Sequence, residues 1–246
     1  MFNLINNIYL KIFKILNILI SYNAKVYYSF FKYGTSPSFE HIKIFKNIDD
    51  KSTFVDVGAN RGQFSLLIHY LYPKNKIIAY EPLKSEFSIL KNIFKNTKNI
   101  KLFNLAVGSE KKSVNIYQTE KEDSSSLLKP GKLQLKYFPK TYVKKILKTK
   151  MIKLNTHIKN LKKPAFLKID VQGYELEVLK GADLKRFKYI YLEGSYVKLY
   201  SNQPLIKSIS NYLLLKGFEK IGRFNLMKNI FGKPLQADFL FINIRK

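Results

Sequence analysis

The chain of 246 residues lacks cysteine and tryptophan, contains only three histidines, and has 17 acidic residues against 44 basic ones. Without cysteine it can form no disulfide bond and offers no thiolate as a nucleophile or as a ligand for zinc or an iron–sulfur cluster. The histidines, His41, His69 and His157, are far apart in the sequence and form no metal-binding motif. The absence of cysteine suits a reducing compartment, so we expect a cytoplasmic protein.

The shortage of acidic residues leaves a formal charge of +27 at pH 7. Lysine and arginine neutralise phosphates, so this charge favours a nucleic acid or an anionic membrane surface as partner. The excess is almost entirely lysine, however, and arginine, which is preferred for bidentate recognition of phosphates and bases, is rare. A lysine-rich composition explains the charge as well as an anionic partner does, and both interpretations stay open.

The apolar N-terminal segment, residues 2–20, has no uncharged run of the ~18 residues that a membrane-spanning helix needs, because Lys11 and Lys14 interrupt it. Its lysines and asparagines fall on one side of a helical wheel and most of its isoleucines and leucines on the other, which is typical of an amphipathic helix. Such a helix could pack on the rest of the chain or on a partner subunit, or residues 1–22 could lie on the cytoplasmic face of a membrane. We expect residues 1–50 to form a helical extension of a domain over residues 51–246.

From residue 52 onward, short apolar runs alternate with longer amphipathic ones. Strands are predicted over residues 53–57, 76–80, 100–107, 165–170, 188–193 and 238–244, with an edge or hairpin strand over residues 113–118. The alternation is typical of βαβ units and predicts an α/β fold with a mostly parallel central sheet flanked by helices. Residues 119–150 are polar and rich in lysine, and we expect a mobile insertion there rather than a core element; such insertions often act as lids or substrate loops.

The most informative motif covers residues 54–64, where a predicted strand carrying Asp56 is followed by Gly58, Gly62 and the start of a helix. The glycines let the backbone turn sharply and approach a ligand closely, and the helix N-terminus presents free N–H groups. Glu81 lies at the tip of the next strand, about 20 residues further on, where an acidic residue binds ribose in dinucleotide folds. The glycine spacing is not that of a dinucleotide fingerprint. The pattern therefore favours a nucleoside ligand without a pyrophosphate, such as S-adenosylmethionine.

A second motif covers residues 166–182 and places Asp170 at the end of another predicted strand. Ligands of open α/β sheets bind outside the carboxyl ends of the strands, so Asp170 is expected in the same cleft as Asp56 and Glu81. Glu175 falls in the first turn of the following helix, where a carboxylate either stabilises the helix dipole or reaches the site.

Together these motifs resemble those of the FkbM-type methyltransferases. The resemblance rests on Asp-Val-Gly-Ala-Asn-x-Gly at 56–62, Tyr-Glu-Pro at 80–82, Leu-Ala-Val-Gly at 105–108 and the run from Leu-Lys-Ile-Asp to Leu-Lys-Gly-Ala at 167–182. It covers roughly residues 50–245. The resemblance implies a class I methyltransferase fold of the Rossmann-like type, S-adenosylmethionine as methyl donor, and transfer to oxygen, often a hydroxyl of a sugar or polyketide.

The resemblance also assigns roles to single residues. The methionine end of the donor would be cradled by Asp56, Gly58, Asn60, Gly62 and Gln63. Glu81, followed by Pro82, would hold the ribose hydroxyls, and Ala106 would border the adenine. One departure is visible: Asn155 stands where the family usually has an aspartate, so this position cannot supply a base.

An acceptor hydroxyl must lose its proton, so the site needs a base. Asp170 and Glu193, both at strand ends, are the candidates, and His157 is a weaker one. Asp170, Glu175 and Glu193 could instead hold a divalent metal ion, and the motifs leave metal dependence open. We expect the acceptor to be a small molecule, a glycan or a glycolipid.

Two other interpretations remain. An RNA or DNA methyltransferase would account for the charge, but Asp-Val-Gln-Gly stands where base N-methyltransferases usually carry Asn/Asp-Pro-Pro-Tyr/Phe, and Lys168 is the one strand-borne candidate for a catalytic lysine tetrad. Nucleic acid is therefore the less favoured partner. A non-catalytic, membrane-associated protein on a degenerate fold is disfavoured because the glycines and Glu81 are intact.

Overall fold

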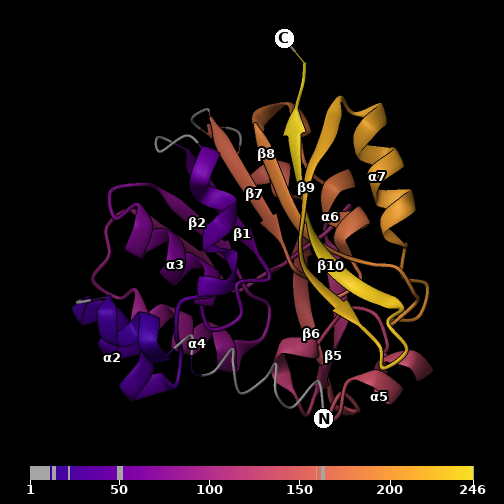
Figure 1. Ribbon diagram of the computed structural model, residues 1–246, viewed down its shortest axis with the longest axis horizontal. Helices are drawn as coiled ribbons and strands as arrows, with labels where there is room; N and C mark the ends of the chain where they lie inside the picture. Colours follow the sequence, from indigo (N-terminus) through magenta and orange to yellow (C-terminus); the bar gives the residue numbers. More distant parts are fainter. Residues whose placement is uncertain are drawn as a thin grey trace.

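The computed structural model describes residues 12, 15–21, 23–48, 52–158, 160–161 and 164–245. Within them, a seven-stranded sheet has the order β3-β2-β1-β7-β8-β10-β9 (Figure 1). Its strands are β1 (Thr53–Val57), β2 (Ile77–Tyr80), β3 (Ile100–Phe103), β7 (Ala165–Ile169), β8 (Tyr189–Ser195), β9 (Phe218–Lys228) and β10 (Pro234–Asn243). Neighbouring strands from β3 to β8 pair in parallel, and β10 is antiparallel to both β8 and β9. The mostly parallel α/β sheet predicted from the sequence is confirmed.

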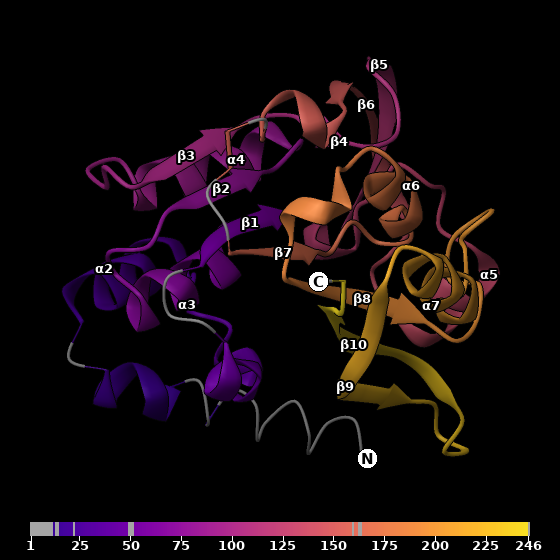
Figure 2. The same cartoon turned by 90° about the horizontal axis from the view of Figure 1, so that it is seen from above.

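Helices cover both faces of this sheet (Figures 1 and 2). The α-helices are α2 (Ala24–Tyr33), α3 (Gln63–Leu71), α4 (Lys84–Ile93), α5 (Lys132–Tyr137), α6 (Glu175–Lys180) and α7 (Ile206–Leu215). The 3-10 helices are η1 (Phe39–Asn47), η2 (Glu122–Ser124), η3 (Leu154–Thr156) and η4 (Leu184–Arg186). No helix among the described residues is long and apolar enough to cross a membrane.

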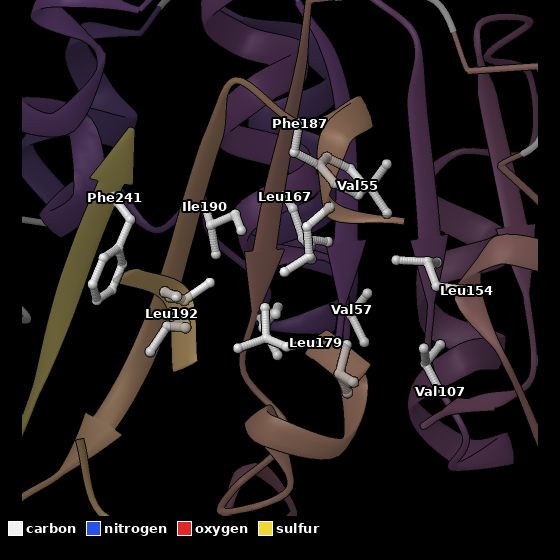
Figure 3. Close-up of a cluster of buried hydrophobic side chains, with 14 of the residues drawn as sticks. Val55, Val57, Val107, Leu154, Leu167, Leu179, Phe187, Ile190, Leu192 and Phe241 are labelled. Atoms are coloured by element: carbon white, nitrogen blue, oxygen red, sulfur yellow. The ribbon is translucent and has the colours of Figure 1, made fainter. Parts of the chain in front are cut away.

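The central strands are buried on both faces, as expected for parallel strands between two layers of helices. Every residue of β1 and β7 is buried. Val55 and Leu167 belong to the cluster that α6 and α7 cover (Figure 3). Phe54 and Phe166 belong to the cluster on the other face, together with side chains of α3 and η1.

The N-terminal extension contributes to the domain core through Ile18, through Val26 of α2 and through η1. The Phe45 ring lies 5.8 Å from the Phe166 ring and 6.0 Å from the Phe64 ring, centre to centre. Aromatic pairs at such separations stabilise a core beyond their buried area. The amphipathic helix predicted over residues 2–20 falls largely outside the described residues. Within the described part of this segment, residues 15–20 are helical.

A smaller sheet contains β4 (Ala106–Val107), β6 (Val143–Ile152) and β5 (Lys112–Thr119), in that order. The predicted insertion over residues 119–150 contains α5 and residues 143–150, which pair with β5, and neither element was predicted. Strand β9 was not predicted either. Both β6 and β9 are mostly exposed, so their sequences lack the strict alternation of apolar and polar residues that identifies a strand with one buried face.

Two phenylalanines of the N-terminal extension test how far it supports the core. Phe45 is 7% exposed and Phe31 is 76% exposed. We expect Phe45→Ala to lower the free energy of unfolding by about 3–5 kcal/mol, because it leaves a cavity against β1 and β7. Phe31→Ala should change it by less than about 0.5 kcal/mol. Urea denaturation of the two variants checks this, and equal effects would contradict it.

Candidate active site

A cleft of about 290 Å³ lies at the carboxyl ends of β1, β2 and β7. Its lining comes from the loops after these strands, from η1 and from residues 122–127. It is the edge at which ligands of open α/β sheets bind.

The loop after β1 passes very close to the loop after β7. Gly58 has a φ of +81°, and a Cβ added to it would lie 1.8 Å from the backbone oxygen of Asp170. Only glycine satisfies both conditions. Asn60 is also left-handed, with a φ of +50°. The cradle that the sequence motif predicts is thus a tight turn shaped by backbone rather than by side chains.

Glu81 presents a fixed carboxylate at the tip of β2. Its Oε2 accepts a hydrogen bond from the Asn60 backbone N–H at 2.8 Å, and its Oε1 accepts one from the Leu83 N–H at 2.8 Å. The side chain is 5% exposed, and burial raises its pKa to about 7 even though these two N–H groups oppose that shift. The remaining lone pairs of this carboxylate could accept the two hydroxyls of a ribose.

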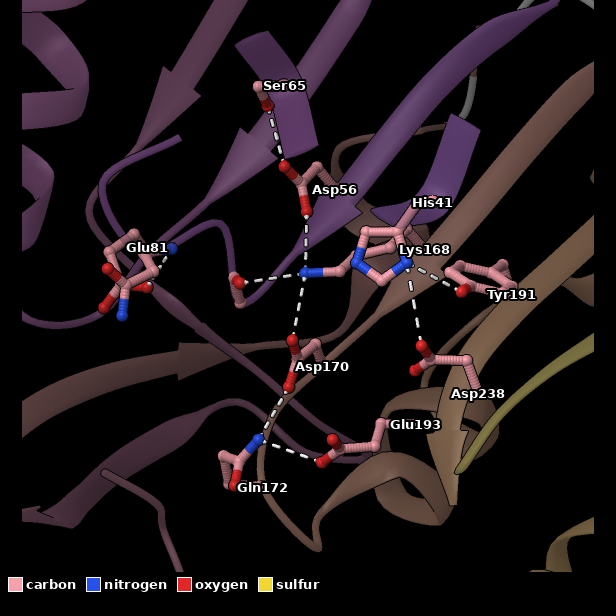
Figure 4. Close-up of polar contacts among 12 residues, drawn as sticks. His41, Asp56, Ser65, Glu81, Lys168, Asp170, Gln172, Tyr191, Glu193 and Asp238 are labelled. Carbon is pink, nitrogen blue, oxygen red and sulfur yellow. Dashed lines mark hydrogen bonds and ion pairs between the residues drawn. The ribbon is translucent and has the colours of Figure 1, made fainter. Parts of the chain in front are cut away.

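A buried ammonium connects the ends of β1 and β7. Lys168 Nζ lies 3.4 Å from Asp56 Oδ1 and 3.5 Å from Asp170 Oδ2, and it donates a hydrogen bond to the Gly58 backbone oxygen at 3.2 Å (Figure 4). Burial by itself lowers the pKa of Lys168, but the two carboxylates outweigh it and raise that pKa. Asp56 is fully buried and also accepts a hydrogen bond from Ser65 Oγ at 2.7 Å. It lies beneath the cleft and orients Lys168.

Gln172 organises the acidic side chains at the ends of β7 and β8. Its Nε2 donates to Asp170 Oδ1 at 2.8 Å and to Glu193 Oε2 at 3.0 Å, while its Oε1 lies 3.0 Å from the Tyr200 hydroxyl. Gln236 Nε2 donates to the other Glu193 oxygen at 2.7 Å. Burial and the neighbouring Asp170 raise the pKa of Glu193 well above its usual range. Sequence reasoning missed Gln172 as a site residue, although it stands in the Asp-Val-Gln-Gly motif.

His41 also lines the cleft and was not predicted to do so. Its Nδ1 lies 2.8 Å from the Tyr191 hydroxyl and 3.6 Å from Asp238 Oδ2. Asp238 accepts a hydrogen bond from Asn225 Nδ2 at 2.7 Å. His41 precedes the recognisable motifs and Asp238 follows them, so no spacing in the sequence relates the two residues.

The predicted residues separate into three groups. Those that line the cleft are Gly58, Asn60, Gln63, Glu81, Pro82, Ala106 and Asp170. Asp56, Gly62 and Glu193 are not among the residues that line it. His157 is exposed, packs against the Phe103 ring at 4.6 Å between centres, and does not line the cleft. Asn155 accepts a hydrogen bond from the Asp183 backbone N–H.

The residues considered as metal ligands are engaged with protein donors. Gln172 binds both Asp170 and Glu193, and Glu175 Oε1 accepts a hydrogen bond from the Gly173 N–H at 2.8 Å. Burial raises the pKa of Glu175 to about 7. Among the described residues, no group of three or more histidine, aspartate or glutamate side chains could hold a metal ion.

Residues 122–127 form one wall of the cleft and are fastened to the motif loops. Arg61 Nη2 lies 2.6 Å from Glu122 Oε2, and Ser126 Oγ donates to the Gln172 backbone oxygen at 2.7 Å. The Tyr200 hydroxyl donates to the Ser124 backbone oxygen at 2.8 Å. Part of the predicted insertion thus borders the ligand space directly.

A strand order with one antiparallel strand near the edge, a glycine turn after β1 and an acidic residue after β2 define a class I methyltransferase architecture. The methyltransferase FkbM domain matches residues 56–220, and the chain belongs to this family.

Curated relatives and solved structures agree with this assignment. Methyltransferase 1 of Beauveria bassiana (strain ARSEF 2860) is 25% identical over 183 residues, which cover 69% of this chain and 73% of that protein. Methyltransferase sdnD of Sordaria araneosa is 26% identical over 221 residues, which cover 73% of this chain and 78% of that protein.

The FkbM methyltransferase structure from Methylobacillus flagellatus KT superimposes with a TM-score of 0.55 at 15% identity over 83% of this chain and 48% of that one, so this chain spans about half its length. M. capricolum TrmK in complex with S-adenosyl-homocysteine has a TM-score of 0.50 at 10% identity, with 85% and 69% of the two chains covered. These structures confirm the predicted class I methyltransferase fold.

The raised pKa of Glu81 makes stability depend on pH. The native carboxyl group holds its proton up to about pH 7, whereas an unfolded glutamate loses it near 4.5. This contribution to stability is complete below the unfolded pKa and is lost as the pH rises through about 7. We expect the free energy of unfolding to fall between about pH 5 and about pH 8, and to fall less in Glu81→Gln. Urea denaturation across this range measures it.

Glu110 supplies the control, because it is exposed and its ion pair with Lys112 lowers its pKa. Glu110→Gln should keep the pH dependence of the wild type over the same range. An unchanged dependence in Glu81→Gln would show that Glu81 does not titrate there.

Proposed function

We propose that the protein is an S-adenosylmethionine-dependent O-methyltransferase that acts on a hydroxyl group of an uncharged, hydroxyl-rich acceptor such as a sugar, a glycan or a glycolipid. The observation that carries this proposal is the cleft in which the buried Glu81 carboxylate faces the glycine turn of Gly58. When bound, S-adenosylmethionine supplies an electrophilic methyl group on a sulfonium.

The residues of the cleft fit this donor. Glu81 keeps free lone pairs for the ribose hydroxyls, and Ala106 and Pro82 provide apolar surface for the adenine ring. The absence of a Cβ at Gly58 lets the loop after β1 pack directly against the Asp170 backbone, so that both loops border the space proposed for the amino-acid end of the donor. The TrmK structure with bound S-adenosyl-homocysteine, which shares the fold, supports the same choice.

The charge of the cleft favours an uncharged acceptor. Although the chain has a net charge of +27, the described lining contains five carboxylates and one lysine, and of these carboxylates Asp170 is paired with that lysine and Glu122 with Arg61. A phosphorylated or nucleic-acid acceptor would meet like charge at this position. Hydroxyl groups, in contrast, donate hydrogen bonds to carboxylates. This supports a carbohydrate acceptor over the alternative of RNA.

Asp170 is the cleft carboxylate placed to meet the acceptor. Its side chain is 39% exposed at the end of β7, and its two oxygens are oriented by Lys168 and Gln172. We propose that it accepts a hydrogen bond from the acceptor hydroxyl and aligns its oxygen with the methyl group, which is the main requirement for this displacement.

The proposal is tested by offering the purified protein labelled S-adenosylmethionine with three matched acceptor sets: neutral glycans and glycolipids, their phosphorylated forms, and RNA. We expect label and the mass of one added methylene only in the neutral set.

Asp170→Ala should lower turnover about 100-fold without changing donor affinity by calorimetry, because alignment is lost. Asp170→Asn should retain more activity than Asp170→Ala. Transfer to RNA alone would contradict the acceptor assignment.

We also propose that the N-terminal segment contacts an anionic membrane. In the helical residues 15–20, Ile18 is 2% exposed and joins the core, whereas Ile15, Leu16, Leu19 and Ile20 are 46–68% exposed. An apolar surface beside a lysine-rich chain suits lipid headgroups and acyl chains together.

We expect the protein to sediment with vesicles of phosphatidylglycerol and phosphatidylcholine, and Leu16→Glu/Leu19→Glu to reduce the bound fraction about tenfold, because charge on this surface opposes burial in lipid. Leu214→Glu/Leu215→Glu, which alters two exposed leucines at the end of α7, is the matched control and should bind as the wild type does. Equal loss in both variants would contradict a specific role for the N-terminal segment.

A further inference from the structure

The turn between β9 and β10, residues 228–233, presents two large apolar side chains to solvent. Ile230 is 84% exposed and Phe231 is 79% exposed. Figure 2 shows this turn, called here the hairpin tip, projecting away from the helices and the body of the sheet. Single apolar residues scattered over a surface are ordinary, but two neighbouring ones at the end of a projection indicate a contact with another apolar phase.

The backbone of the hairpin tip is held by hydrogen bonds within the turn. Asn229 Oδ1 accepts from the Phe231 N–H at 3.0 Å and from the Lys233 N–H at 2.9 Å. The Asn229 N–H donates to the Lys233 backbone oxygen at 2.9 Å, and the Gly232 N–H donates to the Asn229 backbone oxygen at 3.0 Å. An unpaired N–H group is costly in a medium of low polarity. These four N–H groups already have partners, so this turn can enter such a medium without losing them.

The charge around the hairpin tip is of one sign. Lys228 and Lys233 flank the apolar pair, Lys220 and Arg223 precede it on β9, and no acidic residue occurs between positions 220 and 237. Lysine side chains lay their methylene stems along apolar surface and keep the ammonium group in water. An apolar tip between cations therefore matches an anionic membrane, with acyl chains for the tip and headgroups for the lysines.

Two other occupants fit the hairpin tip less well. A stable protein interface buries about 800 Å² on each partner, whereas this tip is narrow and convex, and lipid needs no matching pocket to receive it. A second copy of the chain could pair along β9, which is the last strand in the order of the sheet. Such pairing would bring the basic residues of the two edges together, and charged edges of this kind disfavour it. Lipid is therefore the favoured occupant.

The hairpin tip lies at the edge of the sheet where the cleft lies. Gln236 of β10 pairs with Ser195, the last residue of β8, so the tip extends beyond the carboxyl end of β8 (Figure 1). β8 is parallel to β7, and β7 to β1, whose carboxyl ends border the cleft. Along β9, Asn225 Nδ2 lies 3.1 Å from Nδ1 of His41, which lines the cleft. A membrane that receives the tip therefore meets the edge of the sheet that carries the cleft.

We propose that the hairpin tip inserts into the headgroup region of an anionic membrane and directs the cleft edge of the sheet toward the lipid. This contact is separate from the one proposed for the N-terminal segment, and two contacts in one molecule bind a vesicle more tightly than either alone. The consequence for the reaction rests on the proposed function: the acceptor is a glycolipid whose sugar stands at the membrane surface.

Because the chain has no tryptophan, Phe231→Trp places a single indole at the hairpin tip. We expect its emission to shift to shorter wavelength, and to be quenched by brominated lipid, with vesicles of phosphatidylglycerol and phosphatidylcholine but not with phosphatidylcholine alone. Leu215→Trp is the matched control and should show neither change. Leu215 is 81% exposed and lies beside the start of β9, at the end of that strand away from the tip.

Three results of the fluorescence measurement would overturn the proposal. No shift of Phe231→Trp with anionic vesicles would show that the tip stays in water. A shift that grows with protein concentration in the absence of vesicles would show a second copy at the tip. A shift with RNA but not with vesicles would show a soluble polyanion as the partner.

Vesicle sedimentation supplies a second readout. Ile230→Ser/Phe231→Ser should weaken binding to the anionic vesicles about tenfold, because the apolar contact is lost, and Lys228→Gln/Lys233→Gln should weaken it by about the same factor. Leu214→Ser/Leu215→Ser should bind as the wild type does. Wild-type binding by Ile230→Ser/Phe231→Ser would contradict insertion of the tip.

The consequence for the acceptor is tested with one glycan in two forms, free in solution and as the headgroup of a glycolipid in vesicles. Ile230→Ser/Phe231→Ser should lower methyl transfer to the vesicle form about tenfold and leave transfer to the free form unchanged. An equal effect on both forms would overturn the assignment of a membrane-bound acceptor. Absence of transfer by the wild type to every acceptor would overturn the proposed function, whereas the fluorescence of Phe231→Trp would still decide whether the tip enters lipid.

Discussion

The pairing of the Lys168 ammonium with Asp56 and Asp170 is the interaction on which the architecture of the site depends. An isolated charge in the middle of a sheet would be costly to bury, and so would either carboxylate alone. Together, with the Gly58 carbonyl as a further acceptor, they are compensated, and they fix the ends of β1 and β7 against each other. The glycine turn after β1, the Asp170 carboxylate and the hydrogen bonds of Gln172 are all positioned by these two strand ends.

The strands that could be predicted from sequence are those buried on both faces. Residues 53–57 coincide with β1, and residues 165–170 with β7 to within one residue, because their continuous apolar runs are bounded by polar turns. β6 and β9 were missed for the opposite reason. They are largely exposed, so charged residues occur at alternate and adjacent positions, and their sequences show no regular alternation of apolar and polar residues.

The same distinction holds within the site. Gly58 and Glu81 could be predicted because their roles depend on local backbone: a positive φ, and a position at the tip of a strand. The relation between His41 and Asp238 depends on the packing of η1 and the pairing of β10 with β8, which are tertiary events that no local spacing encodes. The placement of Asp56 was likewise beyond the motif, since its burial follows from the strand partner that carries Lys168.

Strand β10 is inserted between β8 and β9, although it follows both in the sequence. The sheet edge that supports Asp238 therefore cannot be completed while the chain is being synthesised up to β9. His41 is synthesised early, whereas β10, which carries Asp238, is synthesised near the end. A nascent chain can therefore form the glycine turn and position Glu81 before the cleft is complete. Synthesis order thus separates the formation of the part of the cleft around Gly58 and Glu81 from that of the part around His41.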